Sequence, residues 1–152
     1  MKKFLLTLVT FSFIGCTTAN GPSFTKMAVT DDEALIYVYT PERGARTTIP
    51  IPPSISLNDE EIGTLEFNSY YALKITPGDH VLTAQKVRGN LATIQVTLQP
   101  GDVKYIKYVE EATGNVKHIN GATQQSVRSA LVEQSSELAD REIINTKLLS
   151  QL

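Results

Sequence analysis

The sequence predicts a mainly β protein, built as an antiparallel β-sandwich with a C-terminal helix. Short runs rich in aliphatic, β-branched and aromatic residues recur along its middle, and turn signals separate them at intervals of about eight to twelve residues. This spacing is typical of antiparallel sandwiches and barrels. It differs from the alternating strands and helices that build a parallel α/β sheet.

The segmental pattern divides the 152 residues into four parts: a leader over 1–15, a flexible tether over 16–32, the sandwich over 33–133, and a C-terminal helix and tail over 134–152. The formal net charge is −2, or −4 once Lys2 and Lys3 are left out, and no Lys or Arg run remains. Nucleic acid and anionic lipid surfaces are therefore not expected to be electrostatic partners of the chain as a whole. The single cysteine excludes an internal disulfide, so the fold must rest on its apolar core.

The first residues have the form of an export signal. Lys2 and Lys3 supply positive charge, and an almost wholly apolar run of eleven residues follows, from Phe4 to Ile14. This run is as long as a signal-peptide core and shorter than the roughly 20 residues that span a bilayer. Two cleavage sites remain open. An ordinary secretory cut after Ala19 would remove the only cysteine, and a cut before Cys16 would keep it.

Phe13-Ile14-Gly15-Cys16 resembles the lipobox of bacterial lipoproteins, with Phe13 where leucine is commonest. The resemblance implies that the Cys16 thiol receives a diacylglyceryl group and becomes the acylated N-terminus. With Thr17 rather than an aspartate next, it also implies the outer membrane more than the inner. Each buried methylene contributes about 0.8 kcal/mol, so several acyl chains would hold the protein firmly. The tether, a coil of about 20 Å, would keep the domain near the membrane.

The first predicted strand is Ala34–Tyr39, whose near-continuous apolarity indicates burial on both faces. Ile49–Pro53 contains three prolines and suits an edge or connector, or a proline-rich ligand for a partner groove, since proline has no N–H for a sheet ladder. Further strands are expected at Ser54–Leu57, Ile62–Leu65, Tyr70–Ile75, His80–Val87, Leu91–Leu98, Val103–Val109 and Val116–Ile119.

Turn chemistry separates these strands. The predicted turns are Asn58–Glu61, Thr76–Asp79, Arg88–Asn90, Gln99–Asp102 and Thr113–Asn115. Pro-Gly pairs in the second and fourth of them favour type II turns, because proline presets φ and glycine supplies a positive φ.

The C-terminal part is expected to contain a last strand and a helix. The strand is Ser126–Glu133, and Ser135 or Ser136 suits the N-cap of the helix. Acidic residues in the first turn of the helix and a lysine near its end would interact favourably with the helix dipole; they are Glu137, Asp140 and Lys147. Leu138, Ala139 and Ile143 share one helical face, and Ile144 and Leu148 lie outside it. The helix would pack on the sandwich or offer a second face to a partner.

From Ala34 to about Val109 the chain resembles a family of bacterial lipoprotein domains of unknown function, related in pattern to PEGA-type sandwich modules. The motifs that carry the resemblance are Ile36-Tyr37-Val38-Tyr39, the altered turn Asn58–Gly63, Tyr70-Tyr71, Pro77-Gly78-Asp79-His80 and Gly101–Ile106. The resemblance implies a PEGA-like or immunoglobulin-like sandwich. Because the motifs are strand and turn chemistry, they imply no activity.

The sequence contains no recognisable catalytic motif or metal-binding motif. His80 and His118 lack metal-ligand spacing, and no nucleophile elbow, phosphate loop or dinucleotide fingerprint occurs. The adjacent carboxylates Asp31-Asp32, Glu60-Glu61 and Glu110-Glu111 are expected to be solvated. We therefore predict no catalytic residue, metal or cofactor, and Cys16 as the only site residue, the point of lipid attachment.

Three functions remain as hypotheses. The first is a non-enzymatic, lipid-anchored envelope module that faces the periplasm and binds another envelope component, expected to be a protein. The second is a glycan- or peptidoglycan-binding domain that uses its strand tyrosines as a platform; these are Tyr37, Tyr39, Tyr70, Tyr71, Tyr105 and Tyr108. The third is a small envelope hydrolase whose His80 or His118 meets a carboxylate only in the fold.

Overall fold

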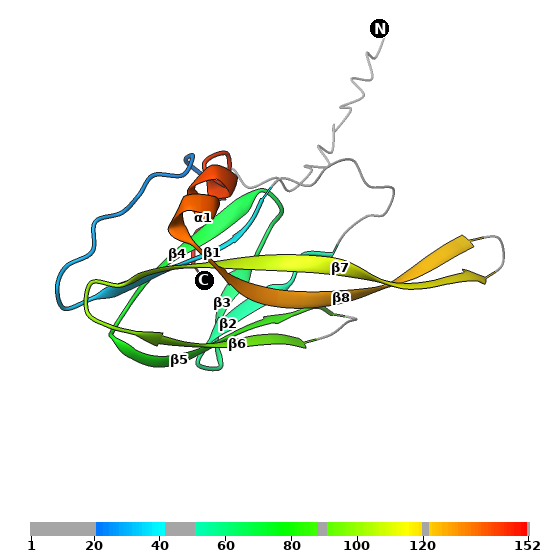
Figure 1. Ribbon diagram of the computed structural model, residues 1–152, viewed down its shortest axis with the longest axis horizontal. Coiled ribbons are helices and arrows are strands. Elements are labelled where there is room, and N and C mark those ends of the chain that lie inside the picture. Colours follow the sequence, from blue (N-terminus) through cyan, green and yellow to red (C-terminus); the bar gives the residue numbers. More distant parts are fainter. Residues whose placement is uncertain (1–20, 42–50, 88–90, 120–121, 152) are drawn as a thin grey trace, which may run out of the picture.

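The computed structural model describes residues 21–41, 51–87, 91–119 and 122–151. Their strands form two facing sheets, and a short helix lies on the outer side of the larger sheet (Figure 1). The larger sheet has the strand order β8-β7-β1-β4-β9, and the smaller has the order β3-β2-β5-β6. The predicted mainly β sandwich with a C-terminal helix is confirmed.

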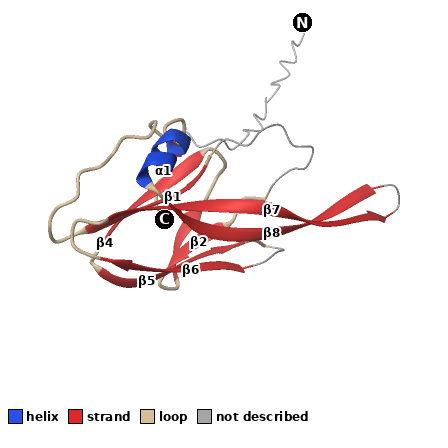
Figure 2. Cartoon of the chain, in the orientation of Figure 1, coloured by secondary structure: helices blue, strands red, loops and turns tan. Residues whose placement is uncertain are grey.

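Figure 2 separates the strands from the single described helix by colour. The five-stranded sheet comprises β1 (Ala34–Thr40), β4 (Ser69–Ile75), β7 (Val103–Ile119), β8 (Ala122–Gln134) and β9 (Lys147–Leu148). The four-stranded sheet comprises β2 (Ser54–Leu57), β3 (Glu60–Thr64), β5 (Gly78–Gln85) and β6 (Leu91–Leu98). Helix α1 spans Ser136–Ile143.

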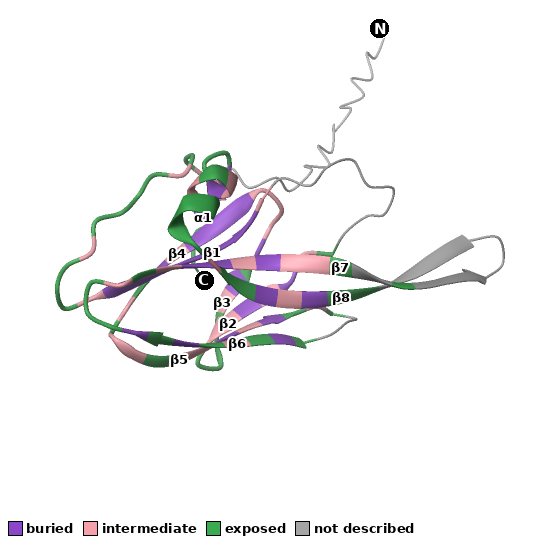
Figure 3. Cartoon of the chain, viewed as in Figure 1, coloured by how far each residue is buried: buried purple, intermediate pink, exposed green. Residues whose placement is uncertain are grey.

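Strand β1 lies at the centre of the five-stranded sheet, and all seven of its residues are buried (Figure 3). Ile36 and Val38 face the four-stranded sheet in the main core. Tyr37 and Tyr39 face the other way, into a second cluster completed by α1 and the N-terminal segment. Burial on both faces explains why the strand is almost continuously apolar, as the sequence indicated.

Two strand pairings are parallel: β1 with β7, and β4 with β9. The remaining pairings between named strands are antiparallel. The chain builds β2 and β3 of the four-stranded sheet between β1 and β4, and β5 and β6 between β4 and β7. It then returns to the five-stranded sheet alongside β1. The parallel pairs are therefore products of long connections, which turn chemistry does not reveal.

The turn at Gln99–Asp102 has the predicted type II form. Gly101 has φ +81°, and the Asp102 N–H donates to the Gln99 carbonyl oxygen at 3.1 Å. The hairpin between β2 and β3 is tighter than predicted, because Asn58 and Asp59 alone form its loop, with φ values of +50° and +67°. Both residue types tolerate this left-handed backbone, so the strand resumes at once and includes Glu60 and Glu61.

The predicted turn at Thr113–Asn115 is wrong. Strand β7 continues through it, and the register with β8 shifts between Ala112 and Val116. Gly114 has φ +76°, a backbone conformation that glycine adopts easily. Here this conformation forms a β-bulge and does not reverse the chain. The long β7–β8 ribbon that results extends beyond the rest of the sandwich (Figure 1).

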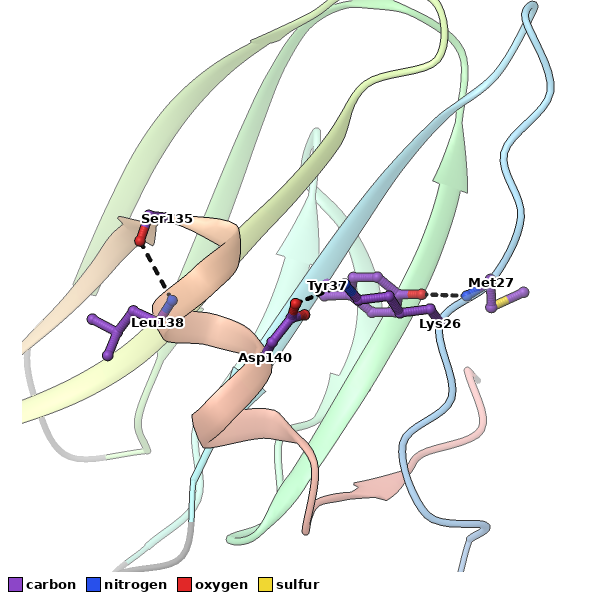
Figure 4. Close-up of polar contacts among 6 residues, drawn as sticks. All are labelled: Lys26, Met27, Tyr37, Ser135, Leu138 and Asp140. Atoms are coloured by element: carbon purple, nitrogen blue, oxygen red, sulfur yellow. Dashed lines mark hydrogen bonds and ion pairs between the residues drawn. The ribbon is translucent and has the colours of Figure 1, made fainter.

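Helix α1 begins after Ser135, whose side chain accepts a hydrogen bond from the Leu138 N–H at 3.5 Å (Figure 4). The predicted N-cap is confirmed. The buried face is narrower than expected, because Ala139 and Ile143 are buried whereas Leu138 is 44% exposed. The helix also ends before Lys147, which instead belongs to β9. A helix this short offers only one turn of contact to the sheet.

The second half of the predicted tether lies against the body. The Phe24 ring packs edge-on against Tyr37 and Tyr70, with centroids 5.1 and 5.3 Å away. The Met27 N–H donates to the Tyr37 hydroxyl at 2.8 Å, and Lys26 forms an ion pair with Asp140 of α1 at 2.7 Å (Figure 4). This segment and α1 together cover the outer face of the five-stranded sheet.

Candidate functional site

The two sheets leave an open cleft where their edge strands meet. Strand β6 is outermost in the four-stranded sheet and β8 is outermost in the five-stranded sheet, and the two lie in contact. The cleft has a volume of about 650 Å³ and is lined by Leu91–Thr93 of β6, Arg128–Leu131 of β8, and Glu111 of β7. In the described part of the chain, each edge strand pairs on one side only. The other side presents backbone N–H and C=O groups.

The cleft lining combines three kinds of contact. Leu91 and Leu131 are apolar, Glu111 and Arg128 carry opposite charges, and Ser129 supplies a hydroxyl. Together with the strand edges, this mixture suits an extended peptide, whose backbone would pair with an edge while its side chains meet alternating surfaces.

A buried polar network lies beside the cleft. The Tyr108 hydroxyl donates to the Glu110 carboxylate at 2.9 Å and lies 2.9 Å from the Ser129 hydroxyl. Glu110 also forms an ion pair with Lys86, and the two side chains are only 5% and 17% exposed. Because Lys86 follows β5 and Glu110 lies on β7, the pair joins the two sheets.

The expectation that Glu110-Glu111 is solvated therefore holds only for Glu111. Alternation along β7 places Glu110 on the same side as buried Tyr108. The sequence shows this alternation. It does not show that Lys86 is the partner of Glu110, because that contact depends on how the sheets face each other.

Residues 30–122 match the family described as Protein of unknown function (DUF2846). The chain belongs to the DUF2846 family. This agrees with the domain of unknown function that the sequence motifs indicated. No curated protein matches the chain. The DUF2846 region covers β1 to β7, so it contains the β6 wall of the cleft and Glu110, while the β8 wall and α1 lie beyond it.

His80 has a structural place in the DUF2846 domain. The Val81 N–H donates to Asn58 Oδ1 at 2.9 Å, which leaves the Asn58 amide nitrogen to donate to His80 Nδ1 at 2.9 Å. His80 Nε2 lies 2.8 Å from the Thr76 carbonyl oxygen, which can only accept. The imidazole therefore donates from Nε2 to Thr76 and accepts at Nδ1 from Asn58. It clamps β5 to two turns, and neither nitrogen is free to act as a base.

The tyrosines do not form an exposed platform. Each of the six is at most 4% exposed. Burial raises the pKa of Tyr70, Tyr71 and Tyr105, and burial with the nearby Glu142 carboxylate raises that of Tyr39. The Tyr39 hydroxyl donates to Glu142 at 2.7 Å. A glycan therefore has no tyrosine face on which to stack.

The other predicted residues are dispersed. Asp31 and Asp32 are exposed before β1, and a hydrogen bond with the Thr30 side chain lowers the pKa of Asp32. Glu60 and Glu61 are exposed on β3. Cys16 and the side chain of His118 lie outside the part of the chain that the structure describes. Among the described side chains, no group of three or more His, Cys, Asp or Glu is placed to hold a metal ion.

The described residues contain no helix with the length and apolarity needed to cross a bilayer.

Proposed function

We propose that this DUF2846 protein is a non-enzymatic binding or structural module of the cell envelope, held to a membrane by acyl chains on Cys16 and facing the periplasm. The observation that carries the proposal is the leader, in which two lysines are followed by a mostly apolar run of eleven residues that ends directly before Gly15-Cys16. Thr17 after the cysteine favours the outer membrane. The described part of the chain, which starts five residues later at Gly21, would be held near the bilayer.

Labelling with a radioactive fatty acid tests the anchor. We expect the full-length protein to incorporate the label and to sediment with membranes, and the Cys16→Ser variant to lose the label and become soluble. A Thr17→Ala variant keeps the sulfur and should stay labelled. Unchanged labelling of Cys16→Ser, or a native N-terminus found unmodified at Asn20, would reject the anchor.

The cleft between β6 and β8 supports a protein partner for the module. Its exposed strand edges suit an extended segment, and Leu91 at its mouth is 57% exposed, which gives such a segment an apolar contact. Catalysis has less support, because both His80 nitrogens and the Ser129 hydroxyl are engaged in hydrogen bonds within the fold.

A photo-crosslinking amino acid in place of Leu91 tests the partner. We expect a reproducible adduct with another envelope protein in intact membranes. The matched control is Gln95, an exposed residue four positions along the same strand that is not among the cleft residues. Equal adducts from both positions, or none from Leu91, would remove the cleft as the binding site.

A further inference from the structure

The N-terminal chain joins the body at one lateral edge of the five-stranded sheet. Ser23 forms an antiparallel bridge with Lys147 of β9, and the Leu148 N–H donates to the Pro22 carbonyl oxygen at 3.0 Å. Gly21 lies so close to β9 that an added Cβ would stand 1.8 Å from the Leu148 carbonyl oxygen. The chain is therefore fixed beside β9 from Gly21 onward.

Only four residues, 17–20, separate Gly21 from Cys16. A fully extended chain spans at most about 3.6 Å per residue, so Gly21 can lie no more than about 18 Å from Cys16. If acyl chains hold Cys16 at a bilayer surface, the β9 side of the body must stay within that distance of the lipid. The short reach restricts which surface can face the membrane.

The surface around Gly21 suits lipid headgroups. Residues 21–28 and 144–151 contain two lysines and no carboxylate, although the chain as a whole is acidic. Ile144 is 58% exposed, and Asn145 beside it is exposed. The nearest acidic side chains of α1, Asp140 and Glu142, are paired with lysines. A neutral to basic surface with an apolar side chain avoids repulsion from headgroup phosphates.

We propose that this edge, formed by residues 21–23, Ile144, Asn145 and Lys147, rests on the headgroups of the bilayer that holds the Cys16 acyl chains. The inference rests on the proposed anchor. Strand β8 lies four strand positions from β9, or about 19 Å at the usual spacing. The cleft between β6 and β8 therefore points away from the lipid and stays open to the periplasm.

A fluorescence quenching experiment tests this orientation. Cys16 is the only cysteine, and acylation blocks its thiol, so an introduced cysteine is the single labelling site. Asn145→Cys and Gln95→Cys are made in the full-length acylated protein, labelled with one fluorophore, and reconstituted into vesicles of phosphatidylethanolamine and phosphatidylglycerol that carry a nitroxide lipid. Both positions are exposed, and Gln95 lies on β6. We expect severalfold stronger quenching at Asn145→Cys.

The outcomes separate the orientation from the anchor. Mass spectrometry of the same preparations reports acylation directly. An unmodified N-terminus would overturn both proposals. An acylated protein with equal quenching at the two positions, or with stronger quenching at Gln95→Cys, would overturn the orientation alone. Absence of quenching at Asn145→Cys would show that this edge does not lie at the lipid, and would overturn the orientation as well.

Discussion

At the scale of single residues, the buried ion pair between Lys86 and Glu110 connects the two sheets beside the cleft. Both charges are largely removed from water, and the pair spans the two sheets beside Ser129. A buried pair adds little compared with apolar residues of the same size, whereas removal of one partner leaves a charge without compensation. We therefore expect the pair to act mainly by fixing how the two sheets face each other beside the cleft.

Replacement of Lys86 by methionine should lower the free energy of unfolding by about 3–5 kcal/mol, because the Glu110 carboxylate would stay buried without the lysine charge while keeping its hydrogen bond from Tyr108. The double variant Lys86→Met/Glu110→Leu should lose much less. The control is Lys74→Met, which breaks a half-exposed pair with Glu33 and should cost about 1 kcal/mol or less. Denaturant unfolding measures all three. Equal losses for Lys86→Met and Lys74→Met would contradict the assignment.

At the scale of elements, the five-stranded sheet depends on two short pieces that cover its outer face. Helix α1 contributes Ala139 and Ile143, and the N-terminal segment contributes Phe24. Between them, Tyr37 stacks on Tyr105 with ring centroids 5.2 Å apart. A helix of eight residues is not stable alone in water, so α1 depends on its packing against the tyrosines, and the N-terminal segment packs on them through Phe24.

Replacement of Phe24 by alanine should therefore release the N-terminal segment. The expected loss in the free energy of unfolding is about 2–3 kcal/mol, below that of a fully buried phenylalanine, since the ring is only half-buried. Hydrogen exchange at the Met27 N–H, which is bonded to Tyr37, should become faster. Thr25→Ala, an exposed neighbour, is the control. Unchanged exchange in Phe24→Ala would show that the segment is held by other contacts.

The whole molecule should be sensitive to alkaline pH. The folded state raises the pKa of Tyr39, Tyr70, Tyr71 and Tyr105 above that of an unfolded tyrosine, which is about 10. The native chain then holds more protons than the unfolded chain once the pH passes about 10, and its stability falls as the pH rises further. Below about pH 9 these groups are protonated in both states and contribute no pH dependence.

A spectroscopic titration checks this expectation. The phenolate absorbance of these tyrosines should stay low above pH 10 and then rise together with the loss of native circular dichroism. The rise should be cooperative, because ionisation requires the rings to leave the core. Gradual phenolate absorbance in a protein that keeps its native circular dichroism would show that the tyrosines are accessible, contrary to their burial.

Local chemistry in the sequence predicted much of the fold, and contacts between distant segments limited the rest. The turn at Pro100-Gly101 and the N-cap at Ser135 were predicted because a few adjacent residues decide them. The parallel pairing of β1 with β7 and the partnership of Lys86 with Glu110 were missed, because they arise only when the sheets assemble. The cleft between β6 and β8 was missed for the same reason.

The bridge between Ser23 and Lys147 has a consequence for how the chain matures. The two side chains are 124 positions apart, so the strands from β1 to β8 and helix α1 must be synthesised before they can meet. A chain that emerges N-terminus first would leave the β9 edge of its sheet incomplete until Lys147 has been synthesised. If the chain is exported as proposed, late completion of this edge would help to keep it unfolded for passage through the export channel.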